Sequence, residues 1–83
     1  MSESTTLEGL APGECAAVVE VDGDDAVSQR LTDLGFWPGT QVRMVRRAPL
    51  GDPIQYSLRG FDLALRAMEA RRVKVERVSG SQA

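Results

Sequence analysis

Residues 41–65 read QVRMVRRAPLGDPIQYSLRGFDLAL, and this stretch decides the fold. Apolar and polar residues alternate along 41–47, 54–59 and 61–65, which is the pattern of strands with one buried face. Val45 breaks the alternation and predicts a bulge in the first of these strands. The stretch therefore predicts a strand with Val42 and Met44 inward, a loop over 48–53, and a hairpin that turns at Arg59-Gly60.

The loop over 48–53 has two prolines and one glycine in six residues, so it cannot continue either neighbouring strand. Its one large apolar residue is Leu50, which we expect at the tip. Prolines limit the conformations of a loop before it meets a partner, which lowers the entropy lost on docking. The loop is therefore predicted to be defined in shape and exposed.

N-terminal to this stretch, the sequence predicts a strand and a short helix. Residues 14–21 alternate, with Cys15, Ala17, Val19 and Val21 expected on the buried face. Residues 26–34 have apolar residues at helical spacing, preceded by carboxylates at 22–25 and ended by Gly35. Before them, residues 1–6 are expected to be frayed, with Thr6 capping a single turn through Leu7 and Leu10.

C-terminal to it, residues 66–70 predict one helical turn, and a last strand follows with Val73 and Val75 inward and Val78 near its end. About five strands with short helices in 83 residues predict a mainly β fold, a small β-barrel. We expect a single domain over 1–83 with its core over 6–78 and flexible ends at 1–5 and 79–83.

Composition excludes several classes of function. The chain has no histidine and one cysteine, so the ordinary catalytic triad, the ordinary catalytic zinc site and an internal disulfide are all missing. No phosphate-binding glycine motif occurs, and the acidic residues over 22–33 do not fit the register of a calcium loop. We therefore expect no enzyme activity, no metal site and no cofactor. Without a signal peptide or a membrane span, the chain is expected to be cytoplasmic.

Charge is divided between two parts of the chain. Residues 1–33 hold eight acids and one base, a net −7, whereas residues 34–83 hold nine bases and four acids, a net +5. The favoured interpretation is that acidic and basic strands pair across one sheet. A nucleic-acid surface is the alternative, although no aromatic residue interleaves the basic run at 71–77.

Four motifs resemble the FeoA family of small proteins in bacterial ferrous iron uptake. They are Arg30-Leu-x-x-Leu-Gly-Phe36, Pro38-Gly39-x-x-Val42, Ala48-Pro-Leu-Gly-Asp-Pro53 and Leu65-Arg66-x-x-Glu69-Ala70, in this order. The resemblance implies an SH3-like barrel related to the C-terminal domain of DtxR-type repressors. It also implies a non-catalytic accessory role on the membrane permease FeoB, whose cytoplasmic part is a GTP-binding domain. A nucleic-acid or regulatory SH3-like adaptor and a weak metal-binding chaperone are the alternatives.

Large apolar residues in turns are the candidates for contact with that partner, because such positions usually face solvent. The alternative is that Phe36 and Trp37 only close the open end of the barrel. We expect the partner to be FeoB and its GTP-binding domain, with a homodimer as an open alternative, and we expect neither nucleic-acid binding nor direct membrane insertion. Any membrane association would be peripheral, at the inner membrane through the partner. The predicted partner-binding residues are Phe36, Trp37, Arg46, Arg47, Leu50, Gly51 and Asp52.

Overall fold

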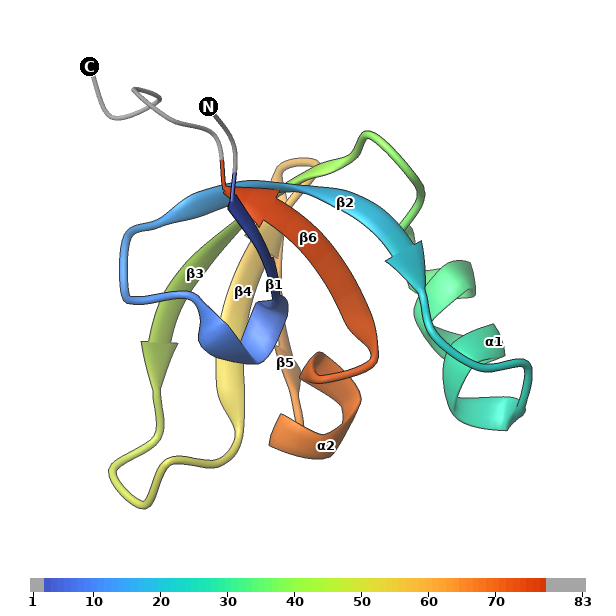
Figure 1. Ribbon diagram of the computed structural model, residues 1–83. Helices are drawn as coiled ribbons and strands as arrows, with labels where there is room; N and C mark the ends of the chain where they lie inside the picture. The colour runs from blue at the N-terminus through green and yellow to red at the C-terminus, as the bar shows by residue number, and fades with distance from the viewer. Residues whose placement is uncertain (1–2, 78–83) are drawn as a thin grey trace.

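The computed structural model describes residues 3–77, which form one curved antiparallel sheet with short helical elements (Figure 1). Neighbouring strands follow the order β1-β6-β2-β3-β4-β5. The predicted mainly β fold with short helices is confirmed, although the sheet has six strands rather than about five and remains open between β1 and β5. The strands are β1 (Glu3–Thr6), β2 (Cys15–Val21), β3 (Gln41–Arg47), β4 (Ile54–Leu58), β5 (Phe61–Leu65) and β6 (Val73–Arg77).

The additional strand is β1, at the start of the chain. Glu3–Thr6 pairs with Lys74–Arg77 of β6, so the expected fraying is wrong for residues 3–6. A four-residue polar segment gives no hydrophobic alternation to detect, and its strand conformation comes from backbone pairing with β6. After it, the 3-10 helix η1 (Leu7–Gly9) forms the predicted turn, but the Thr6 side chain makes no capping hydrogen bond. The expected flexible tail at 79–83 and the position of Val78 lie outside the described residues.

The face that β2 buries is the opposite of the predicted one. Ala16 and Val18 are buried, Cys15 is half-buried, and Val19 is exposed. The reason lies in the pairing, because Ala16 is opposite Val42 of β3 and Val18 is opposite Val75 of β6, both in the core. A register shift between Val18 and Glu20 then reverses the alternation for the end of the strand.

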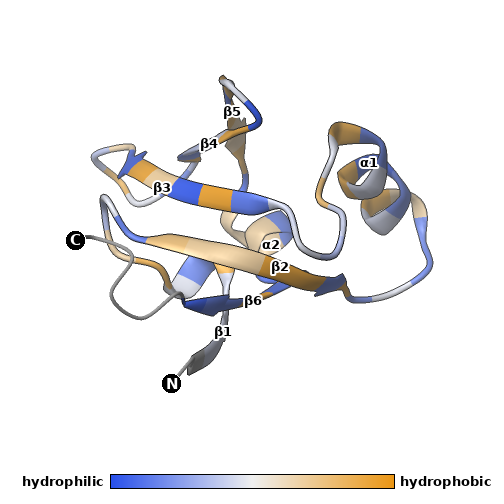
Figure 2. Cartoon of the chain, turned by 90° about the horizontal axis from the view of Figure 1, so that it is seen from above, coloured by the Kyte–Doolittle hydropathy of each residue, from blue (hydrophilic) through white to orange (hydrophobic). Residues whose placement is uncertain are grey.

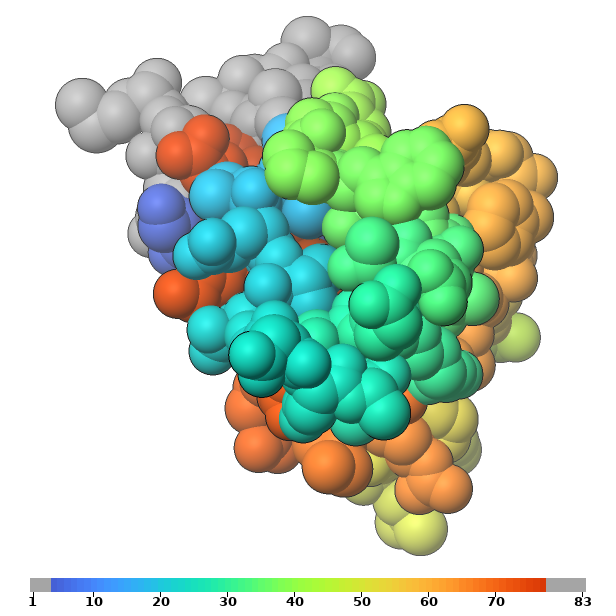
Figure 3. All heavy atoms as spheres, turned by 90° about the vertical axis from the view of Figure 1, so that its right-hand side faces the viewer, coloured from blue at the N-terminus to red at the C-terminus, as the bar shows by residue number. Residues whose placement is uncertain are grey.

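The helix α1 (Ala26–Leu34) has the predicted bounds. At its start, the Asp25 carboxylate accepts a hydrogen bond from the Ser28 N–H at 3.2 Å. At its end, Gly35 has φ +113°, a left-handed conformation that glycine adopts without a Cβ clash. Leu31 enters the core, and Figure 3 shows α1 in turquoise covering one side of the molecule.

The hairpin of β4 and β5 and the bulge in β3 are both confirmed. Arg59 and Gly60 have φ +52° and +88°, as a two-residue hairpin turn requires. The register between β3 and β4 shifts between Met44 and Arg46, so Val45 is the extra residue. Figure 2 shows apolar and polar residues alternating along β3, consistent with one buried face.

The core lies inside the curve of the sheet and is closed by η1, α1 and α2 (Ala67–Ala70). Burial of this apolar surface supplies the main favourable free energy of folding. Its buried apolar side chains are Leu7, Leu10, Ala16, Val18, Leu31, Phe36, Val42, Met44, Ile54, Tyr56, Leu58, Leu65, Ala70, Val73 and Val75.

The predicted pairing of acidic and basic segments is confirmed. Lys74 of β6 lies 3.5 Å from Glu20 of β2, and Arg72 lies 2.7 Å from Asp25. Further ion pairs within the described residues join Arg77 to Glu14, Arg71 to Glu8 and Arg30 to Glu69. The charge asymmetry along the sequence is therefore partly neutralised within the fold, where Arg71, Arg72, Lys74 and Arg77 pair with acids of residues 1–33.

Candidate functional site

The loop over 48–53 places Leu50 in solvent, with 95% of its surface exposed. The loop is closed by two backbone hydrogen bonds, from Ala48 N–H to the Pro53 carbonyl at 2.9 Å and from Gly51 N–H to the Ala48 carbonyl at 2.8 Å. Gly51 has φ +93°, so a residue without a Cβ is favoured at the turn beside Leu50. The sequence prediction of an exposed leucine at the tip of a defined loop is confirmed.

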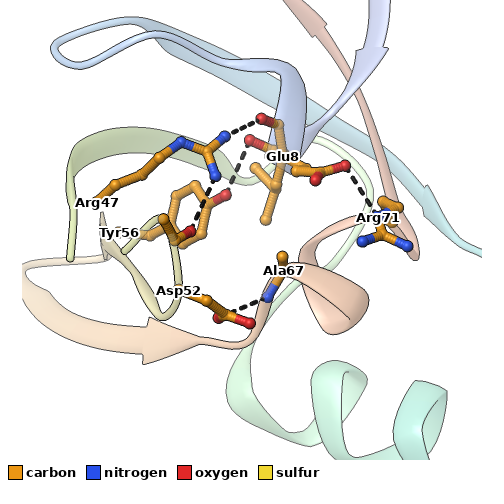
Figure 4. A network of polar contacts seen from close by, with 8 residues as sticks. Glu8, Arg47, Asp52, Tyr56, Ala67 and Arg71 are labelled. Carbon is orange, nitrogen blue, oxygen red and sulfur yellow. Dashed lines mark hydrogen bonds and ion pairs between the residues drawn. The ribbon is translucent and has the colours of Figure 1, made fainter. Parts of the chain in front are cut away.

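Two of the predicted partner-binding side chains, Arg47 and Asp52, also hold this loop in place (Figure 4). The Asp52 carboxylate accepts a hydrogen bond from the Ala67 N–H at 3.0 Å and so satisfies a donor at the start of α2. Arg47 donates to the Gly51 carbonyl at 3.2 Å and to the Glu8 carbonyl at 2.6 Å. These contacts fix the loop against both α2 and η1.

A buried tyrosine lies under this network. The Tyr56 hydroxyl donates to the Leu7 carbonyl at 2.8 Å, and burial is the main cause that raises the pKa of the phenol. Beside it, the Glu8 carboxylate pairs with Arg71 at 3.0 Å. The base of the loop is therefore a packed polar network that joins segments far apart in the sequence.

Arg46, the other predicted steering charge, lies on the outer face of the sheet. Its Nε donates to Gln55 Oε1 at 3.1 Å, and Gln55 Nε2 donates to Asp62 Oδ2 at 3.0 Å. These side chains line a groove of about 640 Å³ between the loop and β5, with Pro49 and Pro53 on its other wall. Arg46 is exposed and makes no ion pair with the described carboxylates, so its charge is available to a partner.

The expectation that Phe36 faces solvent is wrong, because its side chain is 1% exposed. The left-handed Gly35 turns the chain back onto the sheet, and Phe36 N–H donates to the Leu31 carbonyl at 3.3 Å. The next residue, Trp37, is 45% exposed. Its indole N–H donates to the Thr32 carbonyl at 2.8 Å, and the Arg59 guanidinium lies 4.5 Å from its ring centroid.

The predicted residues fall into two separate groups. Trp37 precedes β3 and Leu50 follows it, so the seven-residue strand separates them by roughly 20 Å. Figure 1 shows the segment before β3 near α1 and the loop after β3 at the other end of the sheet. Of the predicted residues, Arg46, Arg47, Leu50, Gly51 and Asp52 form one surface, which we call the loop surface, and Trp37 belongs to another.

Besides Val19, sequence reasoning missed two exposed apolar side chains. Met68 of α2 is 61% exposed, and the contact of Asp52 with Ala67 places it near the loop surface. A helix of four residues has too little periodicity to show which side chain faces outward. Phe61 belongs to the apolar set of the alternation over 61–65 but is 45% exposed, because it begins a strand at the edge of the sheet where little packs over it.

Within residues 3–77, no three histidine, cysteine, aspartate or glutamate side chains gather as a metal site would require. In the same part of the chain, none of the helices is both long and apolar enough to cross a bilayer.

Comparison with known proteins gives a consistent result. A family model described as the FeoA domain matches residues 5–77. A fusion protein of Fe(2+) transport protein A and the Fe(2+) transporter FeoB from Porphyromonas gingivalis is 32% identical over 75 residues, which are 90% of this chain. The chain spans 9% of the length of that relative.

Solved structures show the same fold. A FeoA-like protein from Clostridium acetobutylicum is 31% identical with a TM-score of 0.86, covering 94% of this chain and 91% of that one. The zinc-complexed FeoA of Stenotrophomonas maltophilia, described as a prokaryotic SH3 domain protein, is 39% identical with a TM-score of 0.77, covering 86% and 88%. A manganese-dependent transcriptional repressor, 16% identical with a TM-score of 0.82 over 90% of this chain and 37% of its own, shares the fold alone. The predicted SH3-like fold is confirmed, and the similarity to the repressor is one of fold.

Proposed function

The chain belongs to the FeoA family, and from this membership we propose that it is a small cytoplasmic accessory protein of bacterial ferrous iron uptake. In this proposal it is a non-catalytic module that acts by docking on the cytoplasmic GTP-binding domain of a FeoB-type permease. Its position at the inner membrane is then peripheral and depends on that partner.

The observation that carries the proposal is the relative in which FeoA and FeoB form one polypeptide. Joining two modules by a linker raises their effective concentration to about the millimolar range without any new contact. Such a fusion keeps two parts that act together close to one another. It therefore supports contact between this chain and a separate FeoB-type permease. The match includes 90% of this chain, so the fused module corresponds to nearly all of it.

Leu50 is the residue we propose to enter the partner. Burying an exposed leucine side chain contributes about 1.5–3 kcal/mol, enough to dominate a small interface. Arg47 and Asp52 hold the loop in one shape, so little conformational entropy is lost on docking. Met68 extends the apolar area, and Arg46 adds a charge that accelerates association with an acidic partner.

Trp37 forms a second, smaller contact in this proposal. Its ring is fixed by the Thr32 carbonyl and by Arg59, and it lies at the other end of β3 from Leu50. A partner that engaged both residues would have to extend along the strand.

The proposal is tested by co-purification with the GTP-binding domain and with the full-length permease from the same cell. The variant Leu50→Asp places a charge at the proposed contact, and Val19→Asp is the matched control because Val19 is also exposed but lies on β2. Circular dichroism melts establish that both variants are folded.

We expect the wild-type protein and Val19→Asp to be retained by both baits and Leu50→Asp to lose at least ten-fold in retention. Equal retention of all three proteins would contradict docking through the loop. Absence of retention with either bait would contradict docking on the permease, and sedimentation of the free protein would then show whether it associates with itself.

A further inference from the structure

The strand β5 ends the order of the described sheet and leaves one edge without a neighbouring strand. In a hairpin with a two-residue turn, the residues flanking the turn exchange both backbone hydrogen bonds, and every second pair then does the same. Leu58 and Phe61 flank this turn, so the alternate residues Asp62 and Ala64 direct their N–H and C=O groups away from β4. Such an edge can pair with an extended segment of another protein.

The groove beside Arg46 borders β5 on the side of β4, across the strand from this free edge. Leu63 and Ala64 of β5 line it together with Gln55 of β4, and the prolines of the loop close its far side. An added strand would therefore have backbone partners on β5, and outward side chains that cross over Ala64 would reach the groove. On the inner side, the half-exposed Phe61 and half-buried Leu63 offer apolar contacts.

The charges around this edge indicate the partner. Arg59 precedes β5, Arg66 follows it and Arg46 lies across the groove, and none of the three forms an ion pair with the described carboxylates. Asp62 is the one acidic side chain on β5, and its carboxylate accepts from Gln55. By contrast, Lys74 of β6, next to the opposite edge strand β1, is already paired with Glu20.

The pairing register of β3, β4 and β5 shows which position of an added strand would suit an acidic residue. Arg46, Gln55 and Ala64 lie opposite one another across β3, β4 and β5, and the exposed Ala64 leaves room for a neighbouring side chain to reach over it. The next row of outward-facing side chains contains Ser57 and Asp62. The Asp62 carboxylate would repel an acidic residue of the added strand at this position. Acidic and neutral polar residues should therefore alternate on the outer face of the added strand.

We propose that the β5 edge binds an extended acidic segment of a partner protein by strand addition, with an acidic side chain directed over Ala64 toward Arg46. This surface shares Arg46 with the loop surface but does not include Leu50 at the loop tip, so the inference goes beyond docking on the permease through Leu50. Backbone hydrogen bonds to the β5 edge supply affinity, and the arginines around this edge favour a negatively charged segment over a positively charged one.

The probe is the acetylated and amidated octapeptide SVEVSVEV, added to the full ¹⁵N-labelled chain. Its valines face the side of Phe61 and its glutamates alternate with serines on the outer side. Two control peptides keep the length: SVKVSVKV reverses the charge, and SVEVSVEV with alternate backbone amides N-methylated removes donors to the sheet edge. The protein variants are Arg46→Glu and, as a matched control, Arg43→Glu, an exposed arginine of β3 that does not line the groove.

We expect amide shifts at Asp62 and Ala64, at least ten-fold weaker binding of both control peptides, and at least ten-fold weaker binding to Arg46→Glu than to Arg43→Glu. Equal affinity of the N-methylated peptide would overturn strand addition, and equal affinity of SVKVSVKV would overturn charge selection. Shifts confined to other strands, or no binding at millimolar peptide, would overturn the proposal. If Arg46→Glu does not fold, the comparison of peptides on the wild-type chain still decides it.

Discussion

At the scale of single residues, Asp25 joins the start of α1 to the segment before β6. Its carboxylate accepts two hydrogen bonds from Arg72, at 2.9 and 2.7 Å, and one from the Ser28 N–H. The Arg72 guanidinium is the main cause that holds the pKa of this carboxyl well below its usual range.

The substitution Asp25→Asn should therefore destabilise the protein in a manner that depends on pH. The pKa of Asp25 is lower in the folded protein than in the unfolded protein, where it is about 3.9, so the ionised carboxylate stabilises the fold above that pH. This stabilisation is lost progressively as the pH falls below about 4 and the carboxylate is protonated. The difference in melting temperature between the wild-type protein and Asp25→Asn, measured from pH 7 to pH 2, should narrow below about pH 4. A gap of constant size would contradict the role of the charged pair.

Tyr56 provides a second residue-level prediction, because its buried hydroxyl donates to the Leu7 carbonyl. The substitution Tyr56→Phe keeps the ring and removes this bond, while Leu7 O still accepts from Leu10 N–H. We expect the free energy of unfolding to fall by about 1 kcal/mol, measured by urea denaturation. An unchanged midpoint would show that the bond contributes nothing to stability.

The direction of individual side chains was the least predictable feature at this scale. Phe36 and Trp37 are adjacent aromatic residues in one turn, yet one is buried and the other is half exposed. Their environments depend on how Gly35 redirects the chain and on Arg59 from a distant hairpin, and neither contact is visible in the local pattern.

At the scale of elements, the loop over 48–53 depends on α2. Asp52→Ala removes the acceptor for the Ala67 N–H, which should cost about 1 kcal/mol by analogy with other helix caps. Hydrogen exchange at the Gly51 amide should accelerate because the loop is released from α2. Asp24→Ala, which removes another exposed carboxylate, is the control and should leave that exchange rate unchanged.

Elements with a required backbone conformation were predicted well. Gly35 ends α1 and Gly60 completes the hairpin turn, because both have positive φ, which glycine adopts without a Cβ clash. The strand β1 was missed because its pairing with β6 is long-range and leaves no apolar alternation in Glu3–Thr6. The buried face of β2 was reversed because the shift after Val18 changes the alternation within one strand.

At the scale of the whole molecule, ion pairs between the two oppositely charged parts of the chain join segments that are far apart in the sequence. That use of charge could be predicted from sequence, as could the exposure of Leu50. The supporting roles of Arg47 and Asp52 could not, because their partners Glu8 and Ala67 are 39 and 15 residues away. Nor could the separation of Trp37 from Leu50, which follows from the path of β3 through the sheet.

The central claim, that the loop surface docks on the permease, is tested most directly by titrating the ¹⁵N-labelled protein with the unlabelled GTP-binding domain of the permease. We predict that the amide signals of Leu50, Gly51, Asp52 and Met68 shift or broaden most, and that Leu50→Asp abolishes these changes. Unchanged loop signals at saturating partner, with shifts elsewhere or none, would contradict the claim.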